Sequence, residues 1–514
     1  MAHTTDVLVI GAGGSGMSAA ISAATSGASV VVLEKCARPG GSTAMSVGSF
    51  TAARTSYQYR AGVNDAVELF VADMAKANGT REGLENTALR ELLAENAGPT
   101  LEWLSSIGVQ FLGPTPEPPY EKPRMHNVVP NSRAYASALL RECARRGVEV
   151  RTGARVDALL RNAGGEVIGA RVRGTDYIGR KAVVLATGDY SADPEFKATY
   201  AGASAALVPP VNPGSTGDGF RLGSDVGAVL VQMERLYEGL RFHPSRRPDP
   251  IKLLPAHPAV SQLLRRGAER FPRLLAFVAR GALTSWVAPN NTMYRAGGVL
   301  VGASGRRIAN EDSDSAMARA VASEKDNRAY LIFDETVASR FSAWPNPVST
   351  FPGVAYAYVD DYRRYRPDLH HRASDIGELA AKIGVPAETL RATVTTWNAA
   401  ADSGTDSEFG REHLGEGLLR APYYALGPLG AFVTLTDGGL AVDSRLRVTD
   451  AEEKPIPGLY AAGSTGQGGL QLLNHGLHIG WAMTSGRIAG RNAAHEEMRS
   501  DLAPVRPSER TAPG

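Results

Sequence analysis

The stretch Asp6-Val7-Leu8-Val9-Ile10-Gly11-Ala12-Gly13-Gly14-Ser15-Gly16 decides the fold of this chain, together with Val31-Val32-Leu33-Glu34-Lys35 that follows it. The apolar run that ends at Ile10 is typical of a buried parallel strand, and the glycines after it have G-x-G-x-x-G spacing. Gly11 allows a tight turn, Gly13 lets the backbone approach a pyrophosphate, and Gly16 lets a helix pack closely on the sheet. Glu34 ends the second strand, where a carboxylate accepts hydrogen bonds from ribose hydroxyls. The stretch therefore predicts a dinucleotide-binding βαβ unit.

Length, charge and cysteine content narrow the class of protein. The chain has 514 residues, which implies at least two domains. Its 55 Lys and Arg nearly balance its 53 Asp and Glu, so no nucleic-acid partner is expected. Cys36 and Cys143 have no haem-attachment or metal-cluster spacing, and we expect no metal. Met1 to Thr5 leads directly into the first strand, so we expect no signal peptide and a cytoplasmic protein.

The order of motifs predicts an α/β fold in which a Rossmann-like dinucleotide-binding domain is interrupted by an inserted α+β domain. The pattern of the nucleotide-binding domain covers residues 1–239 and returns over residues 433–497. Residues 240–432 form the expected cap, or substrate domain, and the polar tail 498–514 is expected to be disordered.

Two apolar strands end in similar turns of small residues, far apart in the sequence. One turn is Ala186-Thr187-Gly188 and the other is Ala461-Ala462-Gly463. A turn of this kind brings the backbone near a ligand where a larger side chain would collide. We expect the two turns to meet on one ligand, FAD.

The chain resembles the flavoprotein superfamily of fumarate reductases and 3-ketosteroid 1-dehydrogenases over nearly all of its length. The motifs that carry the resemblance are the opening glycines with Glu34, Gly40–Ser46, Ala186–Gly188, Thr216–Gly219, Gly305–Arg307 with Asn310-Glu311, and Pro455–Gly463. The resemblance implies cofactor contacts at Gly11, Gly13, Gly14, Ser15, Gly16, Glu34, Lys35, Gly41, Ser42, Thr43, Ser46, Val156, Ala186, Thr187, Gly188, Asp218, Gly463 and Ile479. Members with covalent FAD carry a histidine where this chain has Ser42, so we expect non-covalent FAD.

To choose the branch within the superfamily, we compare the residues of this chain with those that contact the substrate in each branch. Ser315 stands where fumarate reductases carry an arginine that acts as the acid, and Thr434 where they carry a histidine that binds the dicarboxylate. The closing motif Gly476–Arg487 is similar to that of the ketosteroid dehydrogenases, in which the N–H at Gly476 would donate to a ketone oxygen. The chain departs from that branch too, because Ser315 and Leu472 replace two expected tyrosines. We therefore expect the ketosteroid (cyclic ketone) branch, with its catalytic base left open.

The candidate catalytic residues are Tyr120, His243, Arg295, Asn474, His475 and Gly476. Tyr120 is the first candidate for proton transfer, with His243 and Asp314 as substitutes, although a surface aromatic residue fits Tyr120 equally well. His243 could instead be a hinge residue bonded to the backbone. Arg295 could bind a substrate carboxylate, but bracing Glu311 is the favoured interpretation.

These residues predict an FAD-dependent dehydrogenase that introduces a C=C bond α,β to the carbonyl of a cyclic ketone, a 3-ketosteroid or a smaller ring. The alternatives are an ene-reductase of the fumarate or urocanate type and a non-catalytic flavin-binding protein. The electron acceptor stays open between a quinone, oxygen and a redox protein. The arginine-containing apolar segment Leu263–Leu283 fits an amphipathic cap helix better than peripheral membrane contact.

Overall fold

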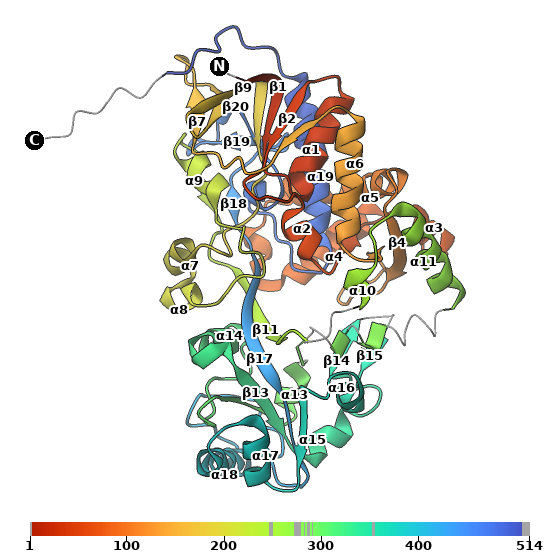
Figure 1. Cartoon of the computed structure of the whole chain (residues 1–514), viewed down its shortest axis with the longest axis vertical. Coiled ribbons are helices and arrows are strands. Elements are labelled where there is room, and N and C mark those ends of the chain that lie inside the picture. Colours follow the sequence, from red (N-terminus) through yellow and green to blue (C-terminus); the bar gives the residue numbers. More distant parts are fainter. Residues whose placement is uncertain are drawn as a thin grey trace, which may run out of the picture.

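The computed structural model of this chain describes residues 3–245, 250–271, 279–281, 283–284, 288–289, 291–351 and 355–505. Figure 1 shows two parts, one above the other, joined by the long strands β11 (Leu236–Phe242) and β17 (Tyr423–Thr436). The upper part contains elements from both ends of the chain, and the lower part contains elements from its middle.

The upper part is built on an eight-stranded sheet. Its strands are β1 (His3–Ile10), β2 (Val30–Leu33), β6 (Glu149–Arg151), β7 (Ala158–Arg161), β8 (Val167–Val172), β9 (Thr175–Leu185), β19 (Arg447–Thr449) and β20 (Pro455–Ala461). The order is β19-β20-β9-β1-β2-β6, with β8 also paired to β9 and β7 to β8. The pairs β20/β9, β9/β1, β1/β2 and β2/β6 are parallel, which confirms the predicted α/β class.

Helices α1 (Gly14–Thr25) and α19 (Leu477–His495) pack closely against each other beside this sheet. A Cβ atom at Gly486 would lie 2.2 Å from the carbonyl oxygen of Ser15, and one at Gly490 would lie 2.0 Å from that of Ala19. Only glycine permits this approach. The first and last helices of the nucleotide-binding region are thus held together by backbone contact.

The remaining upper elements cover the sheet and extend it to one side. The helices are α2 (Gly41–Met45), α3 (Ser56–Arg60), α4 (Val67–Asn78), η1 (Gly79–Leu84), α5 (Thr87–Ser106), α6 (Arg133–Arg145), α7 (Pro194–Ala201), α8 (Ala203–Ala206), α9 (Asp218–Ser224) and η3 (Gly463–Gly466). A small sheet has the order β3-β5-β4, from Ser49–Thr51, Met125–Val129 and Gln110–Thr115, and β10 (Leu230–Val231) pairs with β18 (Gly439–Leu440).

The lower part is α+β and is inserted between β9 and β20. Its antiparallel sheet has the order β11-β17-β13-β12, with β13 at Ala329–Phe333, β12 at Val299–Gly302, and β16 (His370–Ala373) also paired to β17. Around it lie β14 (Ser349–Phe351), β15 (Ala355–Ala357), α13 (Asn291–Arg295), α14 (Asp314–Ser323), η2 (Lys325–Asn327), α15 (Glu335–Arg340), α16 (Val359–Tyr365), α17 (Ile376–Ile383) and α18 (Ala387–Ser403). Trp397 of α18 is 1% exposed and anchors a separate hydrophobic core here.

Two segments differ from expectation or fall partly outside the described residues. Residues 499–505 are ordered, contrary to the predicted disorder, because Arg499 and Val505 donate backbone hydrogen bonds to Arg180 and Arg161 at the sheet edge. Helix α10 (Pro250–Leu253) precedes the expected amphipathic segment Leu263–Leu283. Helix α11 (Pro258–Arg270) covers the start of that segment, while residues 272–278 and 282 lie outside the described residues.

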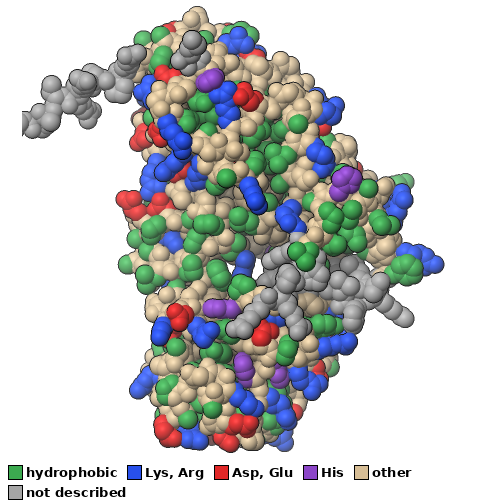
Figure 2. Space-filling model, viewed as in Figure 1, with side chains coloured by type: hydrophobic (Ala, Val, Ile, Leu, Met, Phe, Trp, Pro, Cys, Tyr) green, Lys and Arg blue, Asp and Glu red, His purple; other side chains and the backbone are tan. Residues whose placement is uncertain are grey.

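The surface matches the balanced composition. Figure 2 shows acidic and basic side chains interspersed over the visible face, without a large area of one sign. In the described ranges, no helix combines the length and the apolar character needed to cross a membrane.

Candidate active site

Two glycines of the opening motif are required by packing alone. Gly11 has φ +104°, and a Cβ atom there would lie 2.3 Å from the carbonyl oxygen of Ala186. At Gly16 a Cβ atom would lie 1.9 Å from the carbonyl oxygen of Gly11. The tight turn and the close packing of helix on strand are therefore as predicted.

Gly13 differs, because nothing in the protein itself requires a glycine there. It caps α1 with φ −77° and ψ −170°, which any residue adopts, and a Cβ atom placed there would have no atom within 4 Å. The space in front of the helix is open, and no side chain caps it. Gly13 is thus explained by a group that approaches the backbone from outside, which fits the pyrophosphate of FAD.

A second loop faces this open space. Gly41 has φ +50°, and its Cβ position lies 3.5 Å from Cα of Gly13. Thr43 Oγ1 accepts a 3.2 Å hydrogen bond from the N–H of Gly14, and Ser46 Oγ donates to the carbonyl of Thr43. These contacts place five predicted cofactor residues, Gly13, Gly14, Gly41, Thr43 and Ser46, around one opening.

Glu34 is held by the backbone on both sides. Its carboxylate oxygens accept hydrogen bonds from Ala12 N and Cys36 N, each at 2.7 Å, and the side chain is 8% exposed. Its carbonyl accepts from Ala154 N, which brings the buried Val156 segment alongside. A carboxylate oxygen accepts more than one hydrogen bond, so Glu34 keeps the capacity to bind ribose hydroxyls.

Lys35 and Asp218 bind each other. Lys35 Nζ lies 2.9 Å from Asp218 Oδ2 and also donates to Thr216 Oγ1. Burial would raise the pKa of Asp218, but the hydrogen bond and charge of Lys35 outweigh it and lower that pKa. Arg155 adds a second cation at 3.2 Å. This ion-pair cluster ties the end of β2 to α9 whether or not either residue contacts the cofactor.

The two distant turns of small residues meet, as expected. Leu185 of β9 is in register with Ala461 of β20. Thr465 Oγ1 accepts from Thr187 N at 2.9 Å and donates to the carbonyl of Gly188 at 3.0 Å. Gly463 has φ +64° and packs against Ser15. Both turns therefore lie at the carboxyl edge of the parallel strands beside the glycine motif, where such sheets bind ligands.

Ser42 takes part in a polar contact that the sequence did not reveal. Asn212 Nδ2 donates to Ser42 Oγ at 2.9 Å and to Ser215 Oγ at 3.2 Å. Asn212 and Ser215 belong to the segment before α9, and nothing in their spacing marked them. Non-covalent attachment of FAD, inferred from Ser42, stays a prediction.

The loop Asn474–Gly476 forms the start of α19. His475 donates its backbone N–H to Glu117 Oε1 at 2.9 Å, and His475 Nδ1 lies 2.5 Å from the same oxygen. The hydrogen bond to the Glu117 carboxylate raises the pKa of His475. The N–H of Gly476, whose φ is +80°, has no hydrogen-bond partner among the described residues. Glu117 was not predicted, and only its position ahead of Pro118-Pro119-Tyr120 could have suggested it.

Tyr120 is buried, so its interpretation as a surface aromatic residue is wrong. It is 6% exposed and packs edge-on against Phe70, with the guanidinium of Arg124 over its ring. Its backbone N–H bonds to Glu117, which links it to the His475 loop. Its hydroxyl has no hydrogen-bond partner among the described residues, and burial, reinforced by the charge of Glu117, raises its pKa well above the usual value.

His243 and Arg295 are not brought to this loop. His243 Nε2 lies 3.0 Å from the carbonyl of Asn327, which agrees with the hinge interpretation. Arg295 is exposed and does not brace Glu311, because that buried carboxylate is already bound by Arg307 and Arg411. Asp314 is exposed and accepts from Asn291.

A polar cluster on the other side of the loop was missed. Tyr237 OH lies 3.1 Å from Asp437 Oδ2 and 3.0 Å from the carbonyl of Leu472. His478 Nε2 is 3.8 Å from Asp437, and burial lowers the pKa of His478. Several buried polar atoms of this loop and of the segments near it have no hydrogen-bond partner in the described part of the chain: Glu117 Oε2, Tyr120 OH, Thr436 Oγ1, Gln467 Oε1, Asn474 Nδ2 and His478 Nε2. Such groups are costly to bury unpaired, so this arrangement suits a polar ligand.

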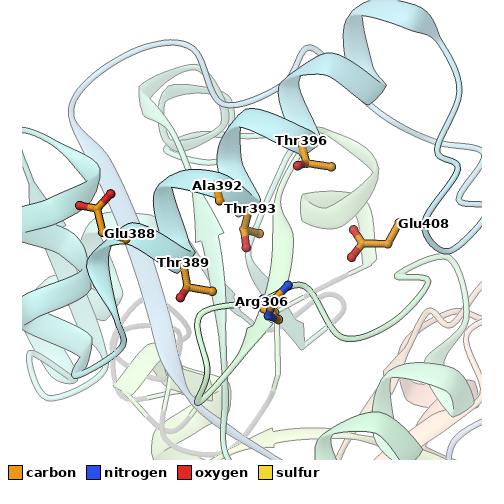
Figure 3. Close-up of a pocket in the computed structure, with 7 residues that line it drawn as sticks. All are labelled: Arg306, Glu388, Thr389, Ala392, Thr393, Thr396 and Glu408. Atoms are coloured by element: carbon orange, nitrogen blue, oxygen red, sulfur yellow. The ribbon is translucent and has the colours of Figure 1, made fainter.

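A separate pocket of about 340 Å³ lies along α18 in the lower part (Figure 3). Its lining consists of Arg306, Glu388, Thr389, Ala392, Thr393, Thr396 and Glu408. None of the predicted site residues contributes to it. Across the described ranges, no group of three or more histidine, cysteine or acidic residues is arranged to hold a metal ion.

Comparison with known proteins identifies the family. A family model described as an FAD binding domain matches residues 6–477, so the chain belongs to this family. A probable fumarate reductase of Shewanella frigidimarina is 28% identical, with 96% of this chain and 76% of that protein covered. The open conformation of a flavocytochrome c3 fumarate reductase superposes with a TM-score of 0.71 at 26% identity, covering 96% of this chain and 78% of the other.

A 3-ketosteroid Δ1-dehydrogenase from Sterolibacterium denitrificans shares the fold, with a TM-score of 0.65 at 20% identity and coverage of 96% and 99%. The chain is therefore an FAD-dependent oxidoreductase. The superfamily expected from the motifs is confirmed. Its placement nearer to the ketosteroid branch is not supported, because sequence relatives at 28% and 27% identity are fumarate reductases.

Proposed function

We propose that this protein reduces a C=C bond conjugated to a carbonyl group. FAD, held by the glycine motif and Glu34 and reduced by an external electron donor, would supply a hydride to the carbon β to the carbonyl. The protein must then stabilise the negative charge that develops on the carbonyl oxygen and provide a proton to the α carbon. The loop Asn474–Gly476 and its neighbours contain groups for both tasks.

The N–H of Gly476 is the proposed carbonyl site. It has no hydrogen-bond partner among the described residues and begins α19, whose dipole places positive charge at this end. Thr51 holds the loop from behind, because its N–H donates to the carbonyl of Gly476 at 3.4 Å and its Oγ1 to that of His475 at 2.7 Å. A rigid, free N–H is suited to an oxygen that gains charge during the reaction.

The protonation states of Tyr120 and His475 identify candidate proton donors. The pKa values of both groups are raised, so both keep their protons to higher pH than usual. Either group could pass a proton to the α carbon in reduction and would accept it in desaturation, so these pKa values do not set the direction. The proposed direction is supported by the relatives, because two fumarate reductases are 28% and 27% identical and a urocanate reductase is 26% identical.

Desaturation of a cyclic ketone is the second candidate. It is favoured by Gly476, because a single uncharged N–H suits a ketone oxygen better than a carboxylate, and the described part of the loop contains no arginine. If Tyr120 were the base for this direction, the rate would rise with pH up to the raised pKa of its hydroxyl.

Anaerobic mixing distinguishes these candidates. Photoreduced protein mixed with cyclic enones and unsaturated acids should regain oxidised flavin absorbance, while oxidised protein mixed with saturated ketones should bleach slowly or not at all. Faster bleaching than reoxidation would overturn the proposed direction. If no compound changes the flavin spectrum in either direction, the protein is a flavin-binding protein without turnover.

The electron partner and the compartment stay proposals. For reduction the partner must donate electrons, as a quinol or a reduced redox protein can, whereas oxygen fits only as the acceptor in desaturation. Assays with a quinol or a reduced carrier protein as donor would separate the first two. We propose a cytoplasmic location, in keeping with Cys36 and Cys143, which are both free thiols. Cell fractionation tests it.

A further inference from the structure

Glu117 uses only one of its two carboxylate oxygens. Its Oε1 accepts the backbone N–H of His475 at 2.9 Å and lies 2.5 Å from His475 Nδ1. Its Oε2 is buried without a hydrogen-bond partner among the described residues, and the residue as a whole is 7% exposed. A carboxylate oxygen that is kept from water without a partner is costly, so a second contact at Oε2 is expected.

The hydroxyl of Tyr120 is a second unpartnered group of the same turn. The backbone N–H of Tyr120 donates to the carbonyl of Glu117 at 3.0 Å, so both side chains start from one tight turn. After burial, the charge of Glu117 is the strongest influence that raises the pKa of Tyr120. One water molecule that accepts from the Tyr120 hydroxyl and donates to Glu117 Oε2 would satisfy both groups.

The other charged groups that act on Tyr120 are engaged elsewhere. They are Arg124, Asp73 and Glu85. Arg124 and Asp73 bind each other, and Glu85 is held in a separate ion pair. Of these four charged groups, Glu117 alone has a buried oxygen without a partner in the described part of the chain. A proton that reaches the enclosed Tyr120 hydroxyl is therefore best supplied through Glu117.

His475 connects Glu117 to the solvent. Its imidazole is 74% exposed, while its Nδ1 lies against Glu117 Oε1. The backbone of the loop is fixed independently of the ring, because Thr51 Oγ1 donates to the carbonyl of His475 at 2.7 Å. An imidazole that contacts a carboxylate at one nitrogen and is otherwise open to water is suited to carry protons inward.

We propose that His475 and Glu117 form a relay that returns a proton to Tyr120 after each turnover. This inference rests on the proposed function, in which Tyr120 protonates the α carbon. The new C–H bond forms as the Tyr120 O–H bond breaks, which leaves a phenolate. The water molecule beside it gives the phenolate a proton and takes one from Glu117. Glu117 takes its proton from His475 Nδ1, and the exposed imidazole regains one from bulk water, so each group ends as it began.

Three variants separate the relay from the shape of the loop. Glu117→Gln keeps an oxygen for the N–H of His475 but cannot carry a proton. His475→Ala keeps that backbone N–H and removes the imidazole. His495→Ala, which removes an exposed histidine at the other end of α19, is the matched control.

The experiment compares the first turnover with later ones on the FAD-loaded protein. The first turnover is the reoxidation of photoreduced protein by a cyclic enone, and steady-state turnover uses reduced methyl viologen as electron donor. Because Tyr120 begins protonated, both relay variants should keep the first rate within about threefold, while steady-state turnover falls roughly 10- to 100-fold. Enone binding, measured from the rise in Tm, should be unchanged. Imidazole in the buffer should restore His475→Ala but not Glu117→Gln, and His495→Ala should resemble the wild-type protein.

Steady-state turnover of His475→Ala at the wild-type rate overturns the relay and leaves the proposed reaction in place. Equal slowing of first and later turnovers, or a loss that imidazole does not restore in His475→Ala, also overturns it. If the wild-type protein desaturates a saturated ketone and reduces no enone, the proposed direction fails. The relay then runs outward and should be slowed by the same factor in His475→Ala. A wild-type protein that catalyses neither reaction overturns both proposals.

Discussion

The cofactor edge of the sheet and the loop around Gly476 are built in different ways. At the cofactor edge the backbone itself forms the site, since Gly11, Gly13 and Gly16 belong to one continuous segment. Around Gly476 the polar groups come from segments that are far apart in sequence, such as Glu117, Tyr237 and Asp437. A backbone site has a local sequence pattern, whereas a site assembled from distant side chains has none.

The difference explains which predictions succeeded. Backbone geometry is fixed by steric rules, so the glycine spacing predicted the βαβ unit and the meeting of the turns at Gly188 and Gly463. The direction of a side chain depends on tertiary packing. Arg295 has the right residue type to brace Glu311, but Arg307 and Arg411 occupy that carboxylate instead.

The largest expected effect comes from two glycines of the same motif. Gly16→Ala places a Cβ atom 1.9 Å from a backbone oxygen, so we expect the free energy of unfolding to fall by at least about 3 kcal/mol. Gly13→Ala meets no atom and should change it by no more than about 1 kcal/mol, while FAD binding weakens about tenfold or more. Denaturant unfolding of the apoprotein and FAD titration measure the two quantities. Unchanged FAD affinity in Gly13→Ala would contradict the pyrophosphate assignment.

The next prediction tests the site around Gly476, which is assembled from side chains of distant segments. Tyr120→Phe keeps the buried ring but removes a hydroxyl that has no protein partner, so folding should be nearly unaffected. Turnover should fall roughly 10²- to 10⁴-fold while substrate binding survives. Phe70→Leu, which alters the packing of the ring and not the hydroxyl, is the control. If Tyr120→Phe reoxidises its flavin at the original rate, the proton comes from His475 or another group of the loop.

Glu34 differs from the glycines of the cofactor edge because it acts through its side chain. Glu34→Ala removes the ribose acceptor and also leaves the N–H groups of Ala12 and Cys36 without a partner. FAD affinity and the free energy of unfolding should therefore both fall, the latter by about 1–3 kcal/mol. Glu34→Gln keeps one acceptor oxygen and should recover part of both. A loss of stability with unchanged FAD affinity would place the ribose elsewhere.

Some of the missed residues carry a sequence signal and others do not. Asp437 immediately precedes Gly438-Gly439, and an acid before a glycine pair is a detectable signal. Tyr237 has no such mark, because its hydrogen bond to Asp437 depends on how β11 and β17 pair. Residues 499–505 were expected to be disordered from their polarity, yet Leu502 packs on Leu160, Ile168 and Ile178. Composition does not show which surface a tail can reach.

The smallest effect concerns the pair of His475 and Glu117. Their hydrogen bond raises the pKa of His475, so its stabilising contribution is fully present below the usual pKa of histidine and is lost as pH rises through the raised value. The imidazole is 74% exposed, so solvent screens most of this contribution. Glu117→Gln should lower the pKa of His475, measured by NMR titration of the imidazole, with little change in the Tm. The NMR signals of His495, whose Nδ1 bonds to the carbonyl of Arg491, serve as an internal reference that the substitution should leave unchanged.

If turnover of Glu117→Gln falls above neutral pH while Tyr120 is intact, His475 supplies the proton. If the pKa of His475 drops and the pH profile of turnover stays flat, Tyr120 is the donor, and Glu117 acts only by holding the loop that presents Gly476.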